Sequence, residues 1–344
     1  MQPSELWRAP RLAVFANGVP LASAIEASVL SAGGFSADFF RVRAALMGDA
    51  AAWAASTAVA IDVQIAPGPL GGFVSLVQGN TDAIAIDPIA GELRLEGRSY
   101  AAQLIETRIQ EIFANRTASE IATILAARHA LTPDVQPTAT PVGRYWELEH
   151  DSVSLDAGAR VSTEWDLLAT LAGWEGFALW VSGTTLHFRP APPSLPLPVL
   201  STTATPAGLP DFAALRLERA LSFAGDIVVI VKSWHSRMGA GTVQTASTNR
   251  GAAATQTYVY VVPNLTPEAA LQLAQMRLAE LCSHELLLQA ELPGEVALLP
   301  RGQFQLVGTG TLFDCVWQID EVERRISLRE GFREFLRARA SSAA

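Results

Sequence analysis

The chain has 344 residues, of which 49% are hydrophobic and 17% charged, so it can form two or three domains with ordinary cores. Its formal net charge of −9 argues against a surface that grips nucleic acid, because neutralising phosphates requires clustered Lys and Arg. No run approaches the roughly 18 apolar residues of a membrane span, and the N-terminal MQPSELWRAPR lacks a signal-peptide core, so we expect synthesis in the cytoplasm.

Short strand patterns fill the first hundred residues. Apolar side chains alternate with polar ones at Phe40, Val42, Ala44 and Leu46, and again at Ile61, Val63 and Ile65. About seven such strands lie between residues 11 and 96, a density typical of an antiparallel barrel or sandwich. Residues 1–97 are therefore expected to form one all-β domain.

Helical spacing begins at Ser99, a candidate N-cap. Helix-spaced apolar residues then follow at Leu104, Ile105, Ile109, Ile112 and Phe113. Thr117 and Glu120 form a capping box for a second helix, and Thr163 or Ser162 caps a third that ends at Gly176. A hairpin turning at Ser182-Gly183 completes an α+β middle domain, residues 98–190, which a Pro-rich linker follows.

Strand patterns return in residues 191–344. They are expected at 215–221, 227–234, 257–262, 286–292, 303–307 and 312–322. One long helix interrupts them, with Thr266 as cap, Pro267 at its first position and an inward stripe of Leu271, Ala274, Leu278, Leu281 and Cys282. Residues 239–256, rich in Gly, Ala and Thr, are expected to be a long loop that becomes ordered against a partner.

Three blocks of sequence carry a family resemblance: residues 97–190, the segment YVYVVPNLTPEAALQLAQMRLAELCSHELLLQAELPG at 258–294, and GTGTLFDCVWQIDEVERRISLREGF at 308–332. They resemble the late control protein D family, the baseplate hub proteins of contractile phage tails, and the related hub part of type VI secretion VgrG spike proteins. The resemblance implies an α+β, mostly β fold, in which two tube-protein-like antiparallel β-barrel domains flank a smaller α+β domain.

A glycosidase needs paired carboxylates, and the sequence offers two candidate groups: Glu164 with Asp166, and Asp320 with Glu321 and Glu323. The first pair opens a helix, where acidic residues favour the macrodipole, and the second ends a strand close to arginines. Both are interpreted as structural. A further run of mixed charge is expected to be a solvated face or a subunit contact; it comprises Arg324, Arg325, Arg329, Arg333, Arg337 and Arg339 with Glu323, Glu330 and Glu334.

Metal-binding and nucleophile motifs give no site either. The histidines His129, His150, His187, His235 and His284 are scattered singly, and Cys282 and Cys315 fit buried small hydrophobes. Gly34-Phe35-Ser36-Ala37-Asp38 lacks the last glycine of a nucleophile elbow, and Gly308 is expected to form a tight turn. Sequons at Asn115 and Asn264 are expected to mark helix starts. Packing or a subunit interface is favoured over ligand stacking for Trp165, Trp174, Trp180, Trp234 and Trp317.

These observations favour a structural protein without catalytic, cofactor or metal sites. The resemblance implies a trimeric baseplate hub in a virion tail, joining a sixfold tail tube to a threefold central spike. Its implied partners are two further copies of itself, a tail spike protein formed by a separate polypeptide, a tail tube or tube-initiator protein, the tape measure protein and the baseplate wedge, with no specific nucleic acid. The alternatives are a cell-wall hydrolase and a carbohydrate-binding adhesin of the same tail.

Overall fold

The computed structural model describes residues 9–48, 50–68, 71–109, 111, 113, 116–139, 142, 163–193, 196–203, 211–235, 240–251, 255–263 and 265–342. The chain forms two compact units, and neither is continuous in sequence. Unit 1 comprises Met1–Pro193, Glu291–Gly302 and Ile319–Leu336; unit 2 comprises Ser194–Ala290, Gln303–Gln318 and Arg337–Ala344.

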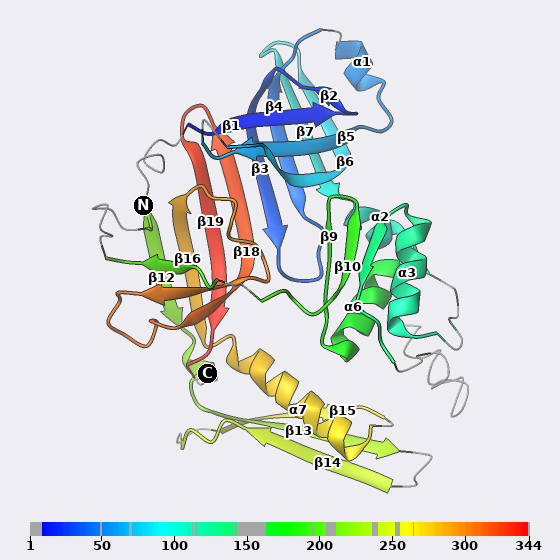
Figure 1. Cartoon of the computed structure of the whole chain (residues 1–344), viewed down its shortest axis with the longest axis vertical. Helices are drawn as coiled ribbons and strands as arrows, with labels where there is room; N and C mark the ends of the chain where they lie inside the picture. The colour runs from blue at the N-terminus through cyan, green and yellow to red at the C-terminus, as the bar shows by residue number, and fades with distance from the viewer. Residues whose placement is uncertain are drawn as a thin grey trace. The chain divides into compact units, whose positions relative to one another are not determined.

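The first part of unit 1 is an antiparallel sheet with a short helix, α1 (Ala50–Ala54). Its strands follow the order β3-β4-β7-β6-β5-β1-β2 (Figure 1). They are β1 (Arg11–Ala16), β2 (Val19–Pro20), β3 (Ala24–Ala32), β4 (Phe39–Ala45), β5 (Ala60–Ala66), β6 (Val74–Asp87) and β7 (Glu92–Ser99). The segments expected as two strands at 74–78 and 83–87 form the single strand β6, with an irregularity in its pairing at Thr81/Ala83.

Alternation along these strands builds one core. The inward side chains Phe40, Val42 and Ala44 of β4 and Ile61, Val63 and Ile65 of β5 are all buried, as the period-two pattern predicts. Val14 of β1 and Val29 of β3, far apart in the strand order, belong to the same cluster. The sheet therefore curls around its own interior.

Strands from the end of the chain complete this sheet. β18 (Val316–Ser327) pairs antiparallel with β3, from Glu321 opposite Ala32 to Ser327 opposite Glu26. β19 (Gly331–Ala340) lies next to β18, and β16 (Leu286–Pro293) next to β19. No strand was expected beyond residue 322, so β19 is a correction. The charges hid its period, because Leu336, Ala338 and Ala340 point inward between outward arginines.

Among the described residues, the α+β part of unit 1 has three helices and a three-stranded sheet. The helices are α2 (Ala101–Glu106), α3 (Ala118–Arg128) and α6 (Glu164–Glu175); the strands are β8 (Thr132–Val135), β9 (Ala178–Ser182) and β10 (Thr185–Arg189). The capping boxes at Thr117 and Thr163 are both present, and Gly176 ends α6 in the left-handed conformation. These helix boundaries are confirmed.

The first helix of this part is shorter than expected. It was expected to continue to Phe113, but α2 ends at Glu106, where Thr107 becomes extended. The Thr107 hydroxyl donates to the Gln103 carbonyl, and Arg108 then forms a β-bridge with Thr163. The chain leaves the helix because its backbone pairs with the start of α6. β8, whose second residue is Pro133, was not expected as a strand and pairs parallel to β10.

Unit 2 contains β11 (Val199–Ser201), β12 (Ala214–Arg219), β17 (Gln303–Val307) and the 3-10 helix η2 (Leu221–Phe223), with parts of β16, β18 and β19. β11 pairs parallel with β17, and β17 pairs antiparallel with β18. Its second layer is a separate sheet of order β14-β13-β15, made of β13 (Asp226–His235), β14 (Ala240–Ser247) and β15 (Thr255–Val261), with the helix α7 (Pro267–Cys282).

Two expectations for unit 2 are wrong in part. Residues 239–256 are not one long loop, because β14 forms an antiparallel pair with β13 along its whole length. The sequence AGTVQTAS of β14 contains one large apolar residue, Val243, so no alternating apolar pattern indicates a strand there. In α7 the cap Thr266 and Pro267 are confirmed, but Leu271 is 37% exposed and Ala270 takes the buried position.

The fold class is confirmed: the protein is α+β and mostly β, with large antiparallel sheets. The three-domain division at residues 97/98 and 190/191 stays a prediction. None of the described helices is long and apolar enough to span a membrane.

Candidate functional site

The first carboxylate pair has two separate structural roles. Glu164 is fully buried at the start of α6, where Arg128 Nη1 and His129 Nε2 each lie 2.5 Å from its carboxylate oxygens. Asp166 accepts a hydrogen bond from the Thr163 backbone N–H at 3.2 Å, as a capping box requires. A buried carboxylate held by a guanidinium and an imidazole anchors α3 to α6.

The second acidic group lies on β18, where the buried face changes side. Trp317 and Ile319 are buried before this point, and Val322 after it. Glu323 pairs with Arg325 Nε at 2.6 Å and accepts from the Ser28 hydroxyl at 3.4 Å. Both interactions tie β18 to its own surface and to β3.

A buried charge cluster in unit 1 was not expected from the sequence. Arg324 is 3% exposed and Glu334 fully buried, which corrects their assignment to a solvated face or subunit contact. Arg324 Nη2 lies 3.3 Å from Glu334 Oε1, Arg324 Nε donates to the Glu295 carbonyl at 2.9 Å, and Glu334 accepts from the Glu295 backbone N–H at 3.0 Å. The sequence does carry a signal for this burial. Arg324 lies two residues before the buried Ile326, and Glu334 two residues before the buried Leu336, so each charge shares the buried face of its strand.

Burial shifts the protonation of this cluster. It raises the pKa of Glu334 to about 7, even though Arg324 opposes the shift. Asp38 interacts electrostatically with Arg324 of this cluster. Burial raises the pKa of Asp38 to about 6, although the hydrogen bond from Ala32 and the charges of Arg301 and Arg324 lower it. The cluster ties β18 and β19 to residue 295.

The histidines are separate from one another in the described structure. His187 Nδ1 lies 2.6 Å from Asp134 Oδ2 and stacks on Trp180 with ring centroids 4.4 Å apart, while Arg301 covers Trp180 at 4.7 Å. The His187 hydrogen bond holds the pKa of Asp134 below its usual range. His284 lies 3.3 Å from Arg339, the His235 side chain is not described, and His150 lies outside the described residues.

The described residues contain no group of three His, Cys, Asp or Glu side chains placed to hold a metal ion. Cys282 is buried and Cys315 half-buried, neither is in a disulfide, and burial raises the pKa of both thiols. A raised thiol pKa makes both cysteines poor nucleophiles.

The nucleophile-elbow candidate is a loop between β3 and β4. Its Ser36 is exposed, and the Phe35 carbonyl accepts the indole N–H of Trp165 at 2.9 Å. Gly308 has φ +94° in a tight turn that Asp314 closes by accepting from the Thr309 and Gly310 backbone N–H groups at 2.9 Å, as expected. The sequons at Asn115 and Asn264 lie outside the described residues.

The tryptophans divide by exposure. Trp165 and Trp317 are buried, as the packing interpretation predicts, and Trp180 is half-buried. Trp174 is 55% exposed, so of the two alternatives packing within the chain is wrong for this residue. Trp234 is 60% exposed on β13 and fits the interface alternative better than packing within the chain.

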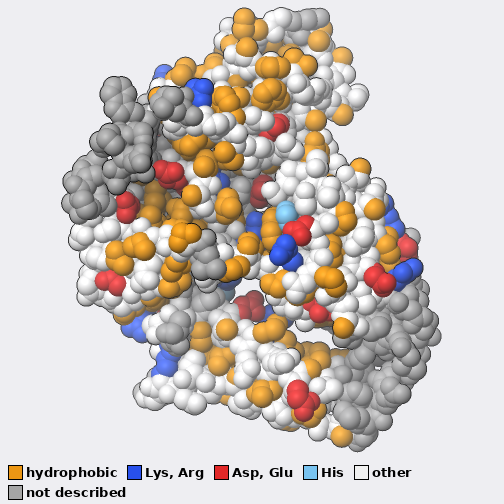
Figure 2. Space-filling model, in the orientation of Figure 1, with side chains coloured by type: hydrophobic (Ala, Val, Ile, Leu, Met, Phe, Trp, Pro, Cys, Tyr) orange, Lys and Arg blue, Asp and Glu red, His pale blue; other side chains and the backbone are white. Residues whose placement is uncertain are grey.

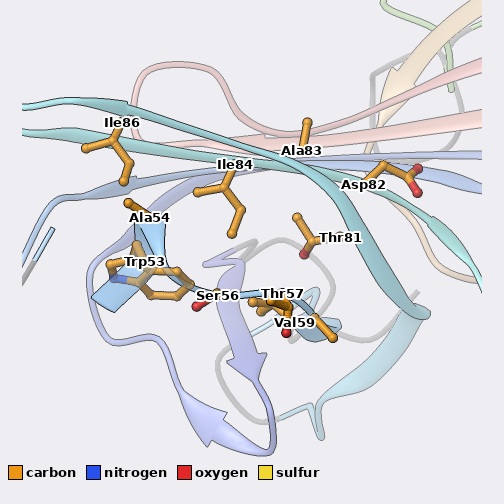
Figure 3. A pocket seen from close by; sticks show the side chains of 11 residues that line it. Trp53, Ala54, Ser56, Thr57, Val59, Thr81, Asp82, Ala83, Ile84 and Ile86 are labelled. Carbon is orange, nitrogen blue, oxygen red and sulfur yellow. The ribbon is translucent and has the colours of Figure 1, made fainter. Parts of the chain in front are cut away.

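A hollow lies between α1 and β6, beside Trp53, Ile84 and Ile86 (Figure 3). Its volume is about 440 Å³. Thr81 Oγ1 is buried at its edge without a hydrogen-bond partner among the described atoms, and Asp82 is held by Arg98 at 2.6 Å. Asp82 is the one acidic residue that lines this hollow, and its ion pair with Arg98 leaves no acid–base pair there.

Charged side chains cover the outer face of the first sheet in a mixed array. Glu26 pairs with Arg43 at 2.8 Å and Glu96 with Arg41 at 2.6 Å. Over the face of the molecule in Figure 2, basic and acidic side chains are likewise interspersed. This mixture lacks the single-sign stripe that phosphate backbones require.

Comparison with known proteins gives structural relatives only. No protein-family model and no curated protein matches the sequence. The structure is similar to the 43 kDa tail protein of prophage MuSo2 from Shewanella oneidensis, with a TM-score of 0.70 and 14% identity, over 97% of this chain and 99% of that one. A tail protein from Neisseria meningitidis gives a TM-score of 0.67 and 16% identity, over 96% of each chain.

The chain has the fold of phage tail proteins. A third relative is the E. coli c3393 protein, described as a component of the type VI secretion system with structural similarity to the T4 tail proteins gp27 and gp5. It matches with a TM-score of 0.56 and 11% identity, over 95% of this chain and 76% of that one. The resemblance to tail and type VI hub proteins is thus confirmed at the level of the fold.

Proposed function

We propose that this tail-fold protein is the structural baseplate hub of a contractile phage tail or phage-like particle. As a homotrimer it joins the sixfold tail tube to the threefold central spike and belongs to the virion tail. The observation that carries the proposal is the match along nearly the full length of both chains to the Shewanella tail protein. A match of that extent covers both units, so it does not come from one common sheet motif.

The contacts of the candidate carboxylates support a structural role for the protein. Glu164, Asp166 and Glu323 each hold a helix start or a strand, and the hollow beside Trp53 offers no acid–base pair. A hydrolase would need two carboxylates on either side of an open cleft. Glu164 is fully buried, which argues against the hydrolase alternative at that position.

Symmetry gives the proposed mechanism. A subunit with two tube-like β regions, repeated three times, presents six similar surfaces to a sixfold tube ring and three to a spike. Docking onto a preformed ring removes the entropic cost of nucleating one, so the hub would start tube growth. The partners proposed on this basis are the tail spike protein and the tail tube or tube-initiator protein.

The test is a tube-assembly assay. Purified hub is mixed with monomeric tube protein and the other initiator components of the same particle, and tube formation is followed by light scattering. We expect the native hub to shorten the lag, and the same protein after heat unfolding to have no effect. Equal lags with and without native hub would contradict the proposed function.

A further inference from the structure

One face of the sheet β14-β13-β15 is covered by α7, and the other is open. Ile227, Val229 and Val231 of β13 point to the helix and are completely buried. The alternate side chains form the opposite surface, here called the open face: Val228, Ile230, Lys232 and Trp234 of β13, Val243, Thr245 and Ser247 of β14, and Thr257, Val259 and Val261 of β15. Its valines 243, 259 and 261 are 60%, 51% and 77% exposed.

The solvated sheet of unit 1 shows what an exposed face looks like in this protein. There Arg41, Arg43 and their acidic partners form ion pairs across neighbouring strands. The open face has no such pairs among the described residues; most of its side chains are valine, isoleucine or threonine, with Trp234 and the single cation Lys232 among them. Clustered exposed apolar side chains on a soluble protein mark an interaction surface.

Lys232 places a positive charge on the open face. It is the only lysine in the sequence; every other basic residue apart from histidine is arginine. Its direct neighbours across the sheet are Val243 on β14 and Val261 on β15, and it forms no ion pair with the described residues. An ammonium group buried among valines is costly unless a carboxylate meets it, so the partner must present an acidic group within an apolar surface.

We propose that the open face is the surface on which one copy of this chain seats its neighbour in the trimer, with Lys232 paired to a carboxylate of that neighbour. The inference rests on the proposed function. Charge supports a second copy as the occupant, because the chain carries 34 acidic residues against 25 Lys and Arg. A threefold assembly requires a contact between unlike surfaces, which closes into a ring, so the open face meets a different, carboxylate-bearing surface of the neighbour.

The single lysine makes the test specific. The full chain is treated with an amine-acetylating ester, and acetylation of Lys232 is followed by peptide mass spectrometry while light scattering reports the mass. In a trimer of 3 × 36.6 ≈ 110 kDa we expect Lys232 to react about tenfold or more slowly than in the urea-unfolded chain, because the contact excludes water. Val243→Arg, which sets a second cation directly opposite Lys232, should give a folded monomer in which Lys232 reacts fast, whereas Met276→Arg, which places the same charge on the exposed side of α7, should assemble.

A second arm identifies the occupant. Carbodiimide joins an amine to a carboxylate at zero length, so Lys232 should couple to an acidic residue of a second copy. Lys232→Arg should still assemble and lose that cross-link. A trimer in which Lys232 reacts as fast as in unfolded chain would overturn the inference and leave the proposed function standing, whereas a stable monomer would overturn both. Protection that appears only after tube protein, spike protein or soluble glycan is added would assign the face to that occupant and also overturn the inference.

Discussion

Arg324 and Glu334 are opposite charges held almost wholly out of water on neighbouring strands. Replacing both charged side chains by well-packed apolar ones can leave the free energy of unfolding nearly unchanged, but removing one of them leaves the other charge buried without a partner. The cluster therefore matters less as a source of stability than as a constraint on register, because only one alignment of β18, β19 and residue 295 satisfies all its hydrogen bonds.

Arg324→Ala should lower the free energy of unfolding by about 3–5 kcal/mol, because it leaves the Glu334 carboxylate buried and unpaired. Arg325→Ala on the same strand removes the half-exposed partner of Glu323 and should cost about 1 kcal/mol or less. Urea unfolding of the two variants, with equal slopes, provides the comparison. Similar costs for both would show that Arg324 is solvated in solution.

The raised pKa of Glu334 predicts how stability depends on pH. Between 4.5, the value in an unfolded chain, and about 7, the folded protein binds more protons at Glu334 than the unfolded chain does. The free energy of unfolding should therefore fall as pH rises through this window. Glu334→Gln should flatten that fall in urea titrations at a series of pH values, whereas Glu323→Gln should leave its shape unchanged. If the free energy of unfolding of the wild type rose from pH 5 to pH 7 more steeply than that of Glu334→Gln, the raised pKa of Glu334 would be refuted.

At the level of elements, the sequence predicts well where a local signal fixes a boundary. Thr117, Thr163 and Thr266 begin helices and Gly176 ends one, because caps act through neighbouring backbone groups. It fails where distant pairing decides. α2 stops because Thr107 and Arg108 pair with the start of α6, and Pro133 enters a strand at a sheet edge.

The functional surfaces follow the same division. The scaffold roles of Asp166 and Gly308 could be assigned from spacing alone, because each acts within a few residues. The open face could not, because it exists only once β14 and β15 lie on either side of β13. Lys232 is conspicuous in the sequence as the sole lysine, yet its valine neighbours come from positions 11 and 29 residues further along the chain.

One element depends on a close approach that only glycine permits. Gly97 of β7 lies opposite Phe40 of β4, and a Cβ at Gly97 would come within 2.1 Å of the Asn80 carbonyl oxygen and 2.6 Å of Phe40 Cζ. Gly97→Ala should cost about 1–3 kcal/mol or more, because the backbone itself must move. Gly34→Ala, where the added Cβ meets nothing within 4 Å, is the control. Thermal melts with equal midpoints for both variants would rule out this packing.

For the whole molecule, obligate assembly links stability to concentration. If folding is completed by trimerisation, the melting temperature should rise by several degrees between about 1 and 100 µM, because association favours the folded state by mass action. Calorimetry at several concentrations measures this directly. Val243→Arg should abolish the dependence, whereas a wild-type melting temperature independent of concentration would indicate a monomer.

The interleaving of the two units also bears on how the protein is made. Ser28 of β3 and its partner Glu323 of β18 are 295 residues apart, so the ribosome releases β3 roughly 15 to 60 s before β18 exists. Throughout that interval the edge of β3 is an unpaired strand in a crowded cell, open to pairing with other nascent chains. Translation speed and chaperone supply, more than final stability, should therefore limit how much of this protein a cell can accumulate.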